Sequence, residues 1–412
     1  MRYVSELRTN WRPLLAAMIG LSSGMSMIGT ITNIMAPHFM EEFGWTKEEF
    51  AYVNSLSIFT FIMLPIAGRL ADVIGVRCTA LIGVITLPVT FLLVSMMTGD
   101  IRQYIALFLV QAGICITTTI TVYSRLVVQY IEKSRGLALG ILGASPYLIS
   151  LVAGPLLNGF VIAHGWRAGY QALAAILLAT GLIALLMAPP ERKEVADAAI
   201  ASLRRRRRGW QDYPMIARQP AFWVLLAAMV LINLPQTIAI AQLGLVALDN
   251  GIRPQDVGFI VAAFSAGVLA GRLLCGIALD HLKAHLVALS SMLLPSIGLF
   301  LLASSFDSFP AVLTAVLLLG CAFGAEGDIV AFLVVRIFGV EIYSSVMGLM
   351  TAAISMATST GAWLSGLTLR ETGSYTLFLT ITGTTVFIGA MLFLLLPAAS
   401  RRTSRLAMAG AE

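Results

Sequence analysis

Arg272 is the side chain in this sequence whose position most clearly indicates chemistry. It lies inside an apolar run that extends from about residue 257 to residue 279. A guanidinium group at that depth in a membrane costs about 2.5–3.5 kcal/mol on insertion scales, and such a cost is tolerated where the side chain faces a water-filled cavity or an anion. Because arginine forms planar, bidentate contacts with carboxylates, Arg272 is a candidate docking point for a negatively charged solute.

Two acidic residues, Glu326 and Asp328, lie in another apolar run, at a depth similar to that of Arg272. Their spacing on a helix prevents both from facing the same way, and we expect at least one to pair with Arg272. Two interpretations remain open. The pair is either a fixed structural contact or a switch, in which a substrate carboxylate takes the arginine and the displaced acid takes a proton. In the switch, one anion and one proton cross together without net charge.

Several weaker candidates complete this set. Six polar residues of other apolar runs are candidates for lining a substrate cavity, although each is equally compatible with a hydrogen bond between helices: Asn33, Asn54, Thr119, Tyr123, Asn233 and Gln236. His38, near the end of the first apolar run, is a candidate proton relay. The four histidines are scattered and the four cysteines form no CxxC pair, so we expect no metal site and no cofactor.

The composition indicates what positions these residues. The chain has 412 residues, of which 58% are hydrophobic and 12% charged, too much apolar surface for a soluble protein of this size. Long apolar runs without alternation favour helices over strands. We therefore predict an all-α membrane protein with twelve transmembrane helices, at about residues 13–39, 50–71, 77–97, 103–127, 136–162, 168–188, 220–247, 257–279, 284–304, 309–335, 344–368 and 374–397.

The distribution of Lys and Arg predicts the orientation of these helices. With the N-terminus in the cytoplasm, 21 of the 27 basic residues fall in cytoplasmic segments and 5 in the opposite loops, and Arg272 is the remaining one. This asymmetry is a strong positive-inside signal and places both termini in the cytoplasm. The charge lies in short loops and in the run Arg204–Arg208, which we interpret as part of a topology-fixing linker, so no nucleic-acid partner is expected.

The sequence also repeats itself with an offset of 208 residues. Gly68 and Asp72 fall on Gly276 and Asp280, and Gly165 falls on Gly373. A repeat of this kind predicts two six-helix bundles in parallel orientation, related by an axis along the membrane normal. We expect an N-terminal bundle at 1–188, a basic cytoplasmic linker at 189–219 and a C-terminal bundle at 220–412.

The segment from Gly68 to Arg77 resembles the loop signature of the major facilitator superfamily, a family of transporters with twelve helices in two bundles. The physical roles are those of a gate: Gly68 lets a neighbouring helix approach, Asp72 caps a helix or pairs with an arginine, and Arg77 opens the next span. The second copy keeps Asp280 but has no glycine after it at the turn. The resemblance implies transport by alternating access. Because an enzyme needs a convergent nucleophile or metal cluster and the four histidines are scattered, we expect no enzymatic activity.

Three places resemble one branch of that superfamily, the monocarboxylate porters and oxalate/formate exchangers: residues 37–46, residues 134–140 and Arg272. Members of that branch carry a substrate-binding arginine in the eighth span. Oxalate exchangers also carry a basic residue in the eleventh span, which 344–368 lacks, so a monovalent anion fits better than a dianion. We expect a monomeric symporter of a small organic monocarboxylate and a proton in the bilayer of a bacterial inner membrane. The alternative is a proton-coupled antiporter that exports drugs or other amphipathic solutes.

Overall fold

The computed structural model describes residues 2–131, 134–189, 212–306, 308–339 and 342–397, and every regular element among them is a helix. Contacts divide the chain into two compact units. Unit 1 comprises Met1–Trp45 and Leu56–Arg205, and unit 2 comprises Thr46–Ser55 and Arg206–Glu412. The all-α prediction is confirmed. Most of the expected linker at 189–219, including Arg204–Arg208, lies outside the described residues.

The helices of unit 1 are long because their apolar runs are long, and several are interrupted. In chain order they are α1 (Arg2–Thr9), α2 (Trp11–Ser22), η1 (Met25–Met27), α3 (Ile28–Phe43), α5 (Ile58–Ser95), α6 (Ile101–Gly113), η2 (Cys115–Thr118), α7 (Ile120–Tyr130), α8 (Arg135–His164) and α9 (Trp166–Met187). Bends of 48° and 49° join α2 to α3 and α6 to α7, so each of these pairs forms one broken span.

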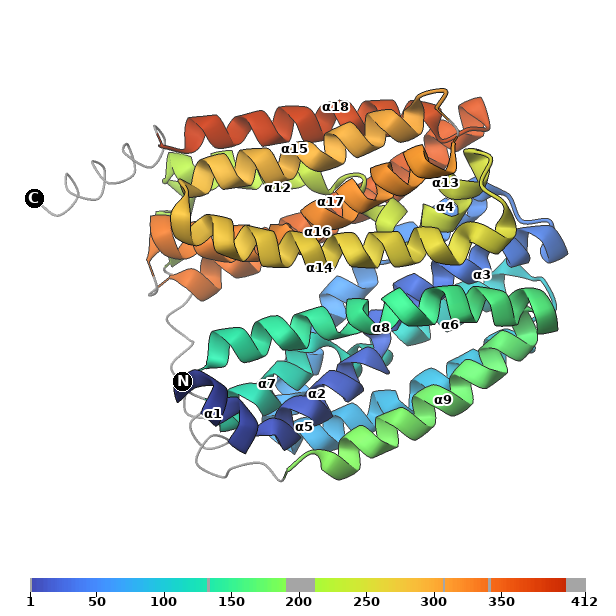
Figure 1. Cartoon of the computed structure of the whole chain (residues 1–412), viewed down its shortest axis with the longest axis horizontal. Helices are drawn as coiled ribbons and strands as arrows, with labels where there is room; N and C mark the ends of the chain where they lie inside the picture. The colour runs from blue at the N-terminus through green and yellow to red at the C-terminus, as the bar shows by residue number, and fades with distance from the viewer. Residues whose placement is uncertain (1, 132–133, 190–211, 307, 340–341, 398–412) are drawn as a thin grey trace, which may run out of the picture. The chain divides into compact units, whose positions relative to one another are not determined.

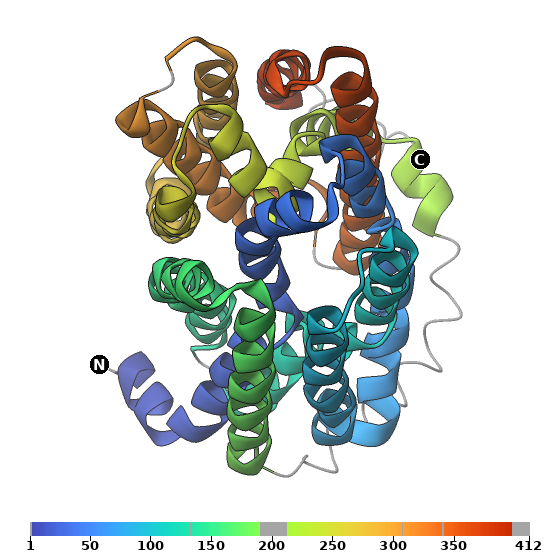
Figure 2. The ribbon, with the colours of Figure 1, turned by 90° about the vertical axis from the view of Figure 1, so that its right-hand side faces the viewer.

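Unit 2 is built in the same way from the second half of the chain and one short helix of the first half. Its helices are α4 (Lys47–Ser55), α11 (Asp212–Ala217), α12 (Pro220–Asn233), η4 (Ile238–Gln242, one turn of π-helix), α13 (Leu243–Asp249), η5 (Pro254–Asp256), α14 (Val257–His281), α15 (Ala284–Ala303), α16 (Phe309–Phe338), α17 (Tyr343–Thr372), α18 (Thr376–Leu392) and η6 (Phe393–Leu395). Figure 2 shows many of these helices nearly end-on.

The helices coincide with the twelve expected spans. Among the described residues, eight helices are long and apolar enough to cross a membrane, and three bent pairs raise the number to eleven. The remaining expected span, at 344–368, coincides with α17. That helix is rich in serine and threonine, several of which are buried: Thr358, Ser359, Ser365 and Thr368.

The sequence repeat is visible in the backbone. Shifting the bounds of α8 by 208 residues gives the bounds of α17, and both helices have 30 residues. Each ends at a glycine with positive φ, Gly165 at 85° and Gly373 at 68°, a region that side chains with a Cβ rarely adopt. The two halves therefore share the helix bounds and a glycine with positive φ before their last span, although ψ is 155° at Gly165 and 0° at Gly373.

One short helix departs from the expected division of the chain. Residues Thr46–Ser55 belong by their contacts to unit 2, whereas the predicted N-terminal bundle ran without interruption to residue 188. The ring of Tyr52 lies against Gly366 of α17, and Lys47 forms an ion pair with Asp249. Asp249 also accepts a 3.3 Å hydrogen bond from the backbone N–H of Tyr375. Figure 1 shows α4 beside α13 and α17.

Helices α14 and α16 pack through glycines spaced four residues apart on each helix. A Cβ added to Gly267 or Gly271 of α14 would lie 2.3 Å and 1.9 Å from backbone oxygens of α16. In the reverse direction, a Cβ on Gly320 or Gly324 of α16 would lie 2.2 Å and 2.1 Å from oxygens of α14. Small residues at such spacing let helix backbones approach closely in a membrane. This contact fixes the two helices that carry Arg272, Glu326 and Asp328.

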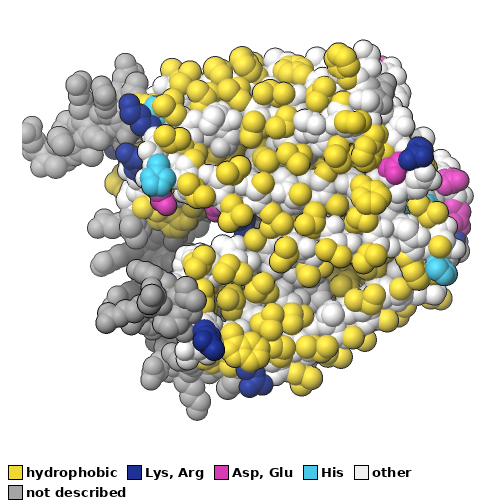
Figure 3. Space-filling view, viewed as in Figure 1, with side chains coloured by type: hydrophobic (Ala, Val, Ile, Leu, Met, Phe, Trp, Pro, Cys, Tyr) yellow, Lys and Arg dark blue, Asp and Glu magenta, His cyan; other side chains and the backbone are white. Residues whose placement is uncertain are grey.

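The outer surface of the helices is apolar over much of its length. Large hydrophobic side chains with high exposure include Leu156, Leu186 and Leu273. On the face drawn in Figure 3, hydrophobic side chains cover the middle of the helices, and most of the charged side chains and histidines gather near the helix ends. This pattern fits helices whose central parts contact lipid hydrocarbon.

Candidate functional site

Arg272 lies on α14, next to the glycine contact with α16. Its side chain is 25% exposed, and its Nε lies 3.9 Å from Oδ2 of Asp328, whose side chain is 44% exposed. That distance is too long for a hydrogen bond. The Nε atom is buried and has no hydrogen-bond partner among the described residues. Arg272 is therefore held near a carboxylate in an ion pair that leaves donors of the guanidinium unused.

Glu326, the second acid of α16, turns away from this pair toward the seventh span. Its Oε1 accepts a 2.7 Å hydrogen bond from Nδ2 of Asn233, and its Oε2 accepts a 3.4 Å hydrogen bond from Nε2 of Gln236. The side-chain amide oxygen of Gln236 in turn accepts a 2.8 Å hydrogen bond from Thr358 of α17. Glu326 is buried, so these amide contacts supply the polar partners that a carboxyl group needs there.

The break in the seventh span creates the amide donors that face Glu326. Helix α12 ends at Asn233, Pro235 follows, and one turn of π-helix, η4, precedes α13. Proline removes a backbone hydrogen bond and clashes with the preceding turn, while a π turn changes the rotation of the helix. As a result, Asn233 and Gln236, three residues apart on either side of Pro235, both point at the same carboxyl group.

A small cavity borders this cluster. Its volume is about 40 Å³, and it is lined by the three polar residues Asn233, Gln236 and Glu326 together with apolar residues of the seventh span, α15 and α16. A cavity of this size has room for one water molecule, and the three polar side chains on its otherwise apolar wall are the partners available to that water. The arrangement therefore separates two roles: Arg272 with Asp328 forms a partly exposed ion pair, and Glu326 with its amides forms a buried polar cluster.

The weaker cavity candidates are mostly buried in the bundles. Asn33 of α3, Asn54 of α4 and Tyr123 of α7 are all below 10% exposed. Asn54 donates to the backbone oxygen of Phe50 on its own helix, and the Tyr123 ring lies against Gly20 of α2. Thr119 is half-buried between η2 and α7 and donates to the oxygen of Ile116. As substrate-binding residues these four stay predictions.

His38, the candidate proton relay, is half-buried near the end of α3 in unit 1, whereas the Glu326 cluster belongs to unit 2. No group of three or more histidine, cysteine or acidic side chains suited to a metal ion occurs in the described part of the chain.

The candidate gate residues lie around a break in α5. Gly75 has φ 84° and ψ 162°, which separates the second and third spans that the continuous helix would otherwise merge. A Cβ added to Gly68 would lie 3.4 Å from the side chain of Thr121 of α7, and the backbone oxygen of Gly68 accepts a 3.4 Å hydrogen bond from Arg125. Arg77 donates to the backbone oxygen of Ala188.

Two further gate candidates are acidic. Asp72 lies in α5, although its side chain is outside the described set. Asp280 is exposed at the end of α14. The gating roles of all four residues, Gly68, Asp72, Arg77 and Asp280, stay predictions.

Two features of the site were missed in the sequence. Ser365 of α17 donates a 2.9 Å hydrogen bond to Gln242 of the π turn, which ties the eleventh span to the seventh, and both side chains are fully buried. The glycine pairs of α14 and α16 were readable as Gly-x-x-x-Gly in both spans, at Gly267 to Gly271 and at Gly320 to Gly324. This second signal is typical of close helix packing, but it does not identify the partner, because Gly136 and Gly140 of α8 have the same spacing and a Cβ added there meets nothing within 4 Å.

Comparison with known proteins gives consistent results. The family model described as Major Facilitator Superfamily matches residues 15–245 and 230–411. Monocarboxylate transporter 11 of Homo sapiens is 23% identical over 401 residues, which cover 93% of this chain and 81% of the relative. Monocarboxylate transporter 4 of Gallus gallus is 22% identical over 377 residues, which cover 88% and 77%. Among solved structures, a D-xylose-proton symporter matches with a TM-score of 0.71 and 13% identity, over 93% of this chain and 97% of the other.

Proposed function

Because this chain belongs to the major facilitator superfamily, and is thus a multi-pass membrane transporter and not an enzyme, we propose that it carries a small organic monocarboxylate by alternating access together with a proton. The single observation that carries the proposal is the state of Arg272. Its guanidinium lies within the span of α14, its only ion-pair partner among the described residues is 3.9 Å away, and its Nε is buried without a hydrogen-bond partner. A carboxylate can bind such a group through two parallel hydrogen bonds.

The substrate class has two further supports. Relatives at 22–23% identity are named monocarboxylate transporters. In addition, α17, the eleventh span, has no basic residue before Arg370 in its last turn, so the described part of that span offers no second cation for a dianion. The single cation Arg272 is therefore matched by a substrate with a single negative charge.

The geometry favours Asp328 as the acid that exchanges a proton. Asp328 is the carboxylate that lies near Arg272, and it is partly exposed. A substrate carboxylate that binds the guanidinium removes the counter-ion of Asp328, and a carboxylate without a counter-ion at this depth takes up a proton. Glu326 already has an amide donor on each oxygen, so we assign it the role of anchoring α16 to the break in the seventh span.

The test is carboxylate uptake into liposomes that contain the purified protein. Lactate, pyruvate and benzoate serve as probes, with succinate as a dianion and xylose as an uncharged solute. We expect Arg272→Ala to abolish saturable monocarboxylate uptake and Arg272→Lys to retain a weak part of it, because lysine keeps the charge but not the planar donor pair. Arg370→Ala is the matched control, since Arg370 is an exposed arginine whose partner is the neighbouring Glu371.

The outcome that contradicts the proposal is saturable monocarboxylate uptake that is equal in wild type and Arg272→Ala. Proton-driven extrusion of an amphipathic cation by both proteins would favour the alternative, a proton-coupled exporter.

The orientation is part of the same proposal. With 21 of 27 basic residues on one side, we place both termini in the cytoplasm of a cell with a bacterial inner membrane, and we propose that the monomer is the working unit. A C-terminal tag that resists protease added outside intact cells, and becomes accessible after lysis, is the result expected for this orientation.

A further inference from the structure

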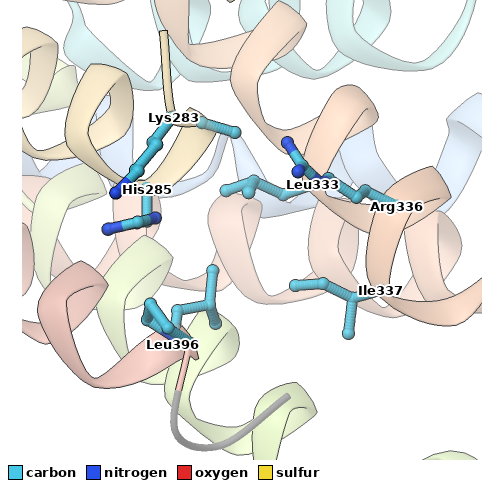
Figure 4. Close-up of a pocket in the computed structure, with 8 residues that line it drawn as sticks. Lys283, His285, Leu333, Arg336, Ile337 and Leu396 are labelled. Atoms are coloured by element: carbon cyan, nitrogen blue, oxygen red, sulfur yellow. The ribbon is translucent and has the colours of Figure 1, made fainter. Parts of the chain in front are cut away.

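A pocket at one end of unit 2 is lined by basic and apolar side chains and shares no residue with the Arg272 and Glu326 sites. Its volume is about 360 Å³, and it lies where α15 begins, where α16 ends and where the chain continues beyond η6. The lining residues are Lys283, Ala284, His285, Leu333, Arg336, Ile337, Leu396 and Pro397. Figure 4 shows Lys283 and His285 side by side on one side of the pocket, with Leu333, Arg336 and Ile337 on the other.

The position of two basic residues runs against helix electrostatics. Lys283 is the N-cap residue of α15, and His285 lies in its first turn. The amino-terminal end of a helix carries partial positive charge and favours anions, so a lysine there is unfavourable by itself. Arg336 lies in the last turn of α16, where a cation is favourable, but its side chain reaches the same pocket. A bound anion reduces the repulsion between the charges of Lys283 and Arg336.

No acidic side chain is among the described residues that line this pocket. Neither Lys283, His285 nor Arg336 forms an ion pair or hydrogen bond with a described side chain, whereas other exposed basic residues do. Lys47 pairs with Asp249, and Arg370 pairs with Glu371. The pocket therefore concentrates positive charge from two separate elements without an acidic partner from the described chain.

The rest of the pocket is apolar. Leu333, Ile337, Leu396 and Pro397 complete its wall, and large apolar side chains near the same helix ends are strongly exposed, among them Leu282, Leu286 and Leu395. A small inorganic anion has no apolar part that could pack against such a wall. A phospholipid can contact both parts of the pocket, because its phosphate can lie among the basic groups while its glycerol backbone and acyl chains follow the apolar helix surface.

We propose that this pocket binds the headgroup phosphate of an anionic phospholipid, with Lys283 and Arg336 as the two cationic contacts and His285 beside them. The lipid would connect the first turn of α15 to the last turn of α16 and to the residues that follow η6, and so brace one end of unit 2. Free phosphate shares the headgroup chemistry but lacks the acyl chains, and this difference separates the two sources in an experiment.

The test measures lipid retention on the full-length protein. Delipidated protein in a neutral detergent is titrated with dioleoyl phosphatidylglycerol or dioleoyl phosphatidylcholine, and the retained lipid is counted by native mass spectrometry. We expect phosphatidylglycerol to be retained and phosphatidylcholine to be lost. Each of Lys283→Gln and Arg336→Gln should weaken retention about fivefold, and the double variant roughly thirtyfold, if each basic residue contributes as it does at an anionic membrane surface.

Three controls make the result interpretable. Arg370→Gln removes an exposed arginine in the last turn of α17, which does not line the pocket, and should leave retention unchanged. The double variant Lys283→Arg and Arg336→Lys keeps both charges and should retain the lipid, which separates loss of charge from loss of fold. Equal phosphatidylglycerol affinity in the wild type and the double glutamine variant would overturn the proposal. So would displacement of the lipid by inorganic phosphate at an equal concentration, or loss of the lipid from the charge-conserving variant.

Discussion

The contact between α14 and α16 gives the sharpest test of how the Arg272 site is positioned. In the variant Gly271→Ala, the new methyl group would lie 1.9 Å from the backbone oxygen of Cys321 and 2.5 Å from its carbonyl carbon. Ordinary contact begins at 3.4 Å, so the methyl group is about 1.5 Å too close to backbone atoms that cannot rotate away. The helices must separate, and overpacking of this kind typically costs about 1–3 kcal/mol.

The same separation acts on the neighbouring residue. Arg272 follows Gly271 directly, and the ion pair with Asp328 already spans 3.9 Å. An added separation of about 1 Å moves the guanidinium further from its partner and out of the geometry that a bound carboxylate needs. We therefore expect Gly271→Ala to lower both the thermal unfolding temperature and the affinity for the transported monocarboxylate.

The assay is thermal unfolding of purified protein in detergent, with and without a saturating monocarboxylate. Gly276→Ala is the matched stability control, because it lies five residues further on the same helix and an added Cβ there meets nothing within 4 Å. We expect Gly276→Ala to be neutral or stabilising by up to about 1 kcal/mol, from the higher helix propensity of alanine. If Gly271→Ala had the same unfolding temperature as the wild type, and the same rise on adding the monocarboxylate, the view that close helix approach positions Arg272 would be refuted.

Three further predictions concern other parts of the molecule. In liposome uptake, Asp328→Asn should keep carboxylate exchange between equal pools but lose accumulation driven by a pH gradient, which for one proton per anion is about tenfold per pH unit. Glu326→Gln should keep this coupling to the pH gradient. The reverse result would assign the proton to Glu326. Trp166→Ala should cost about 3–5 kcal/mol in thermal unfolding, because its indole packs against a ring cluster that includes Phe39, 4.9 Å away between centroids. Asp249→Asn should change unfolding by less than about 1 kcal/mol, since its ion pair with α4 is partly exposed; a larger loss would show that this pair holds α4 in place.

The spans and the depth of the charged residues could be predicted from the sequence because each depends on a local property. Hydropathy located the helices, and the rise per residue placed Arg272 and the two acids at similar depth. The turn at Gly75 was also predictable, because a glycine between two apolar runs supplies a conformation that other residues rarely adopt.

The rotational facing of the helices was not predictable in the same way. Which acid approaches Arg272 depends on the close contact of α14 with α16, and the amides that face Glu326 depend on the break at Pro235 and the π turn. A proline or a π turn rotates everything that follows it by an amount that periodicity does not specify. The assignment of α4 to unit 2 was missed for a related reason, since a hydropathy profile contains no information about which neighbours a span contacts.

Because α4 groups with unit 2, the polypeptide crosses between the two units more than once. The polypeptide passes from one unit to the other after Trp45, returns after Ser55, and passes over again near residue 205. Cutting the chain between residues 190 and 211 would thus remove one of three covalent crossings, and α4 would still hold the first fragment through its packing on α17, where the ring of Tyr52 lies against Gly366. Two fragments made separately, 1–200 and 201–412, should therefore reassemble and co-purify, because α4 of the first fragment packs against helices of the second.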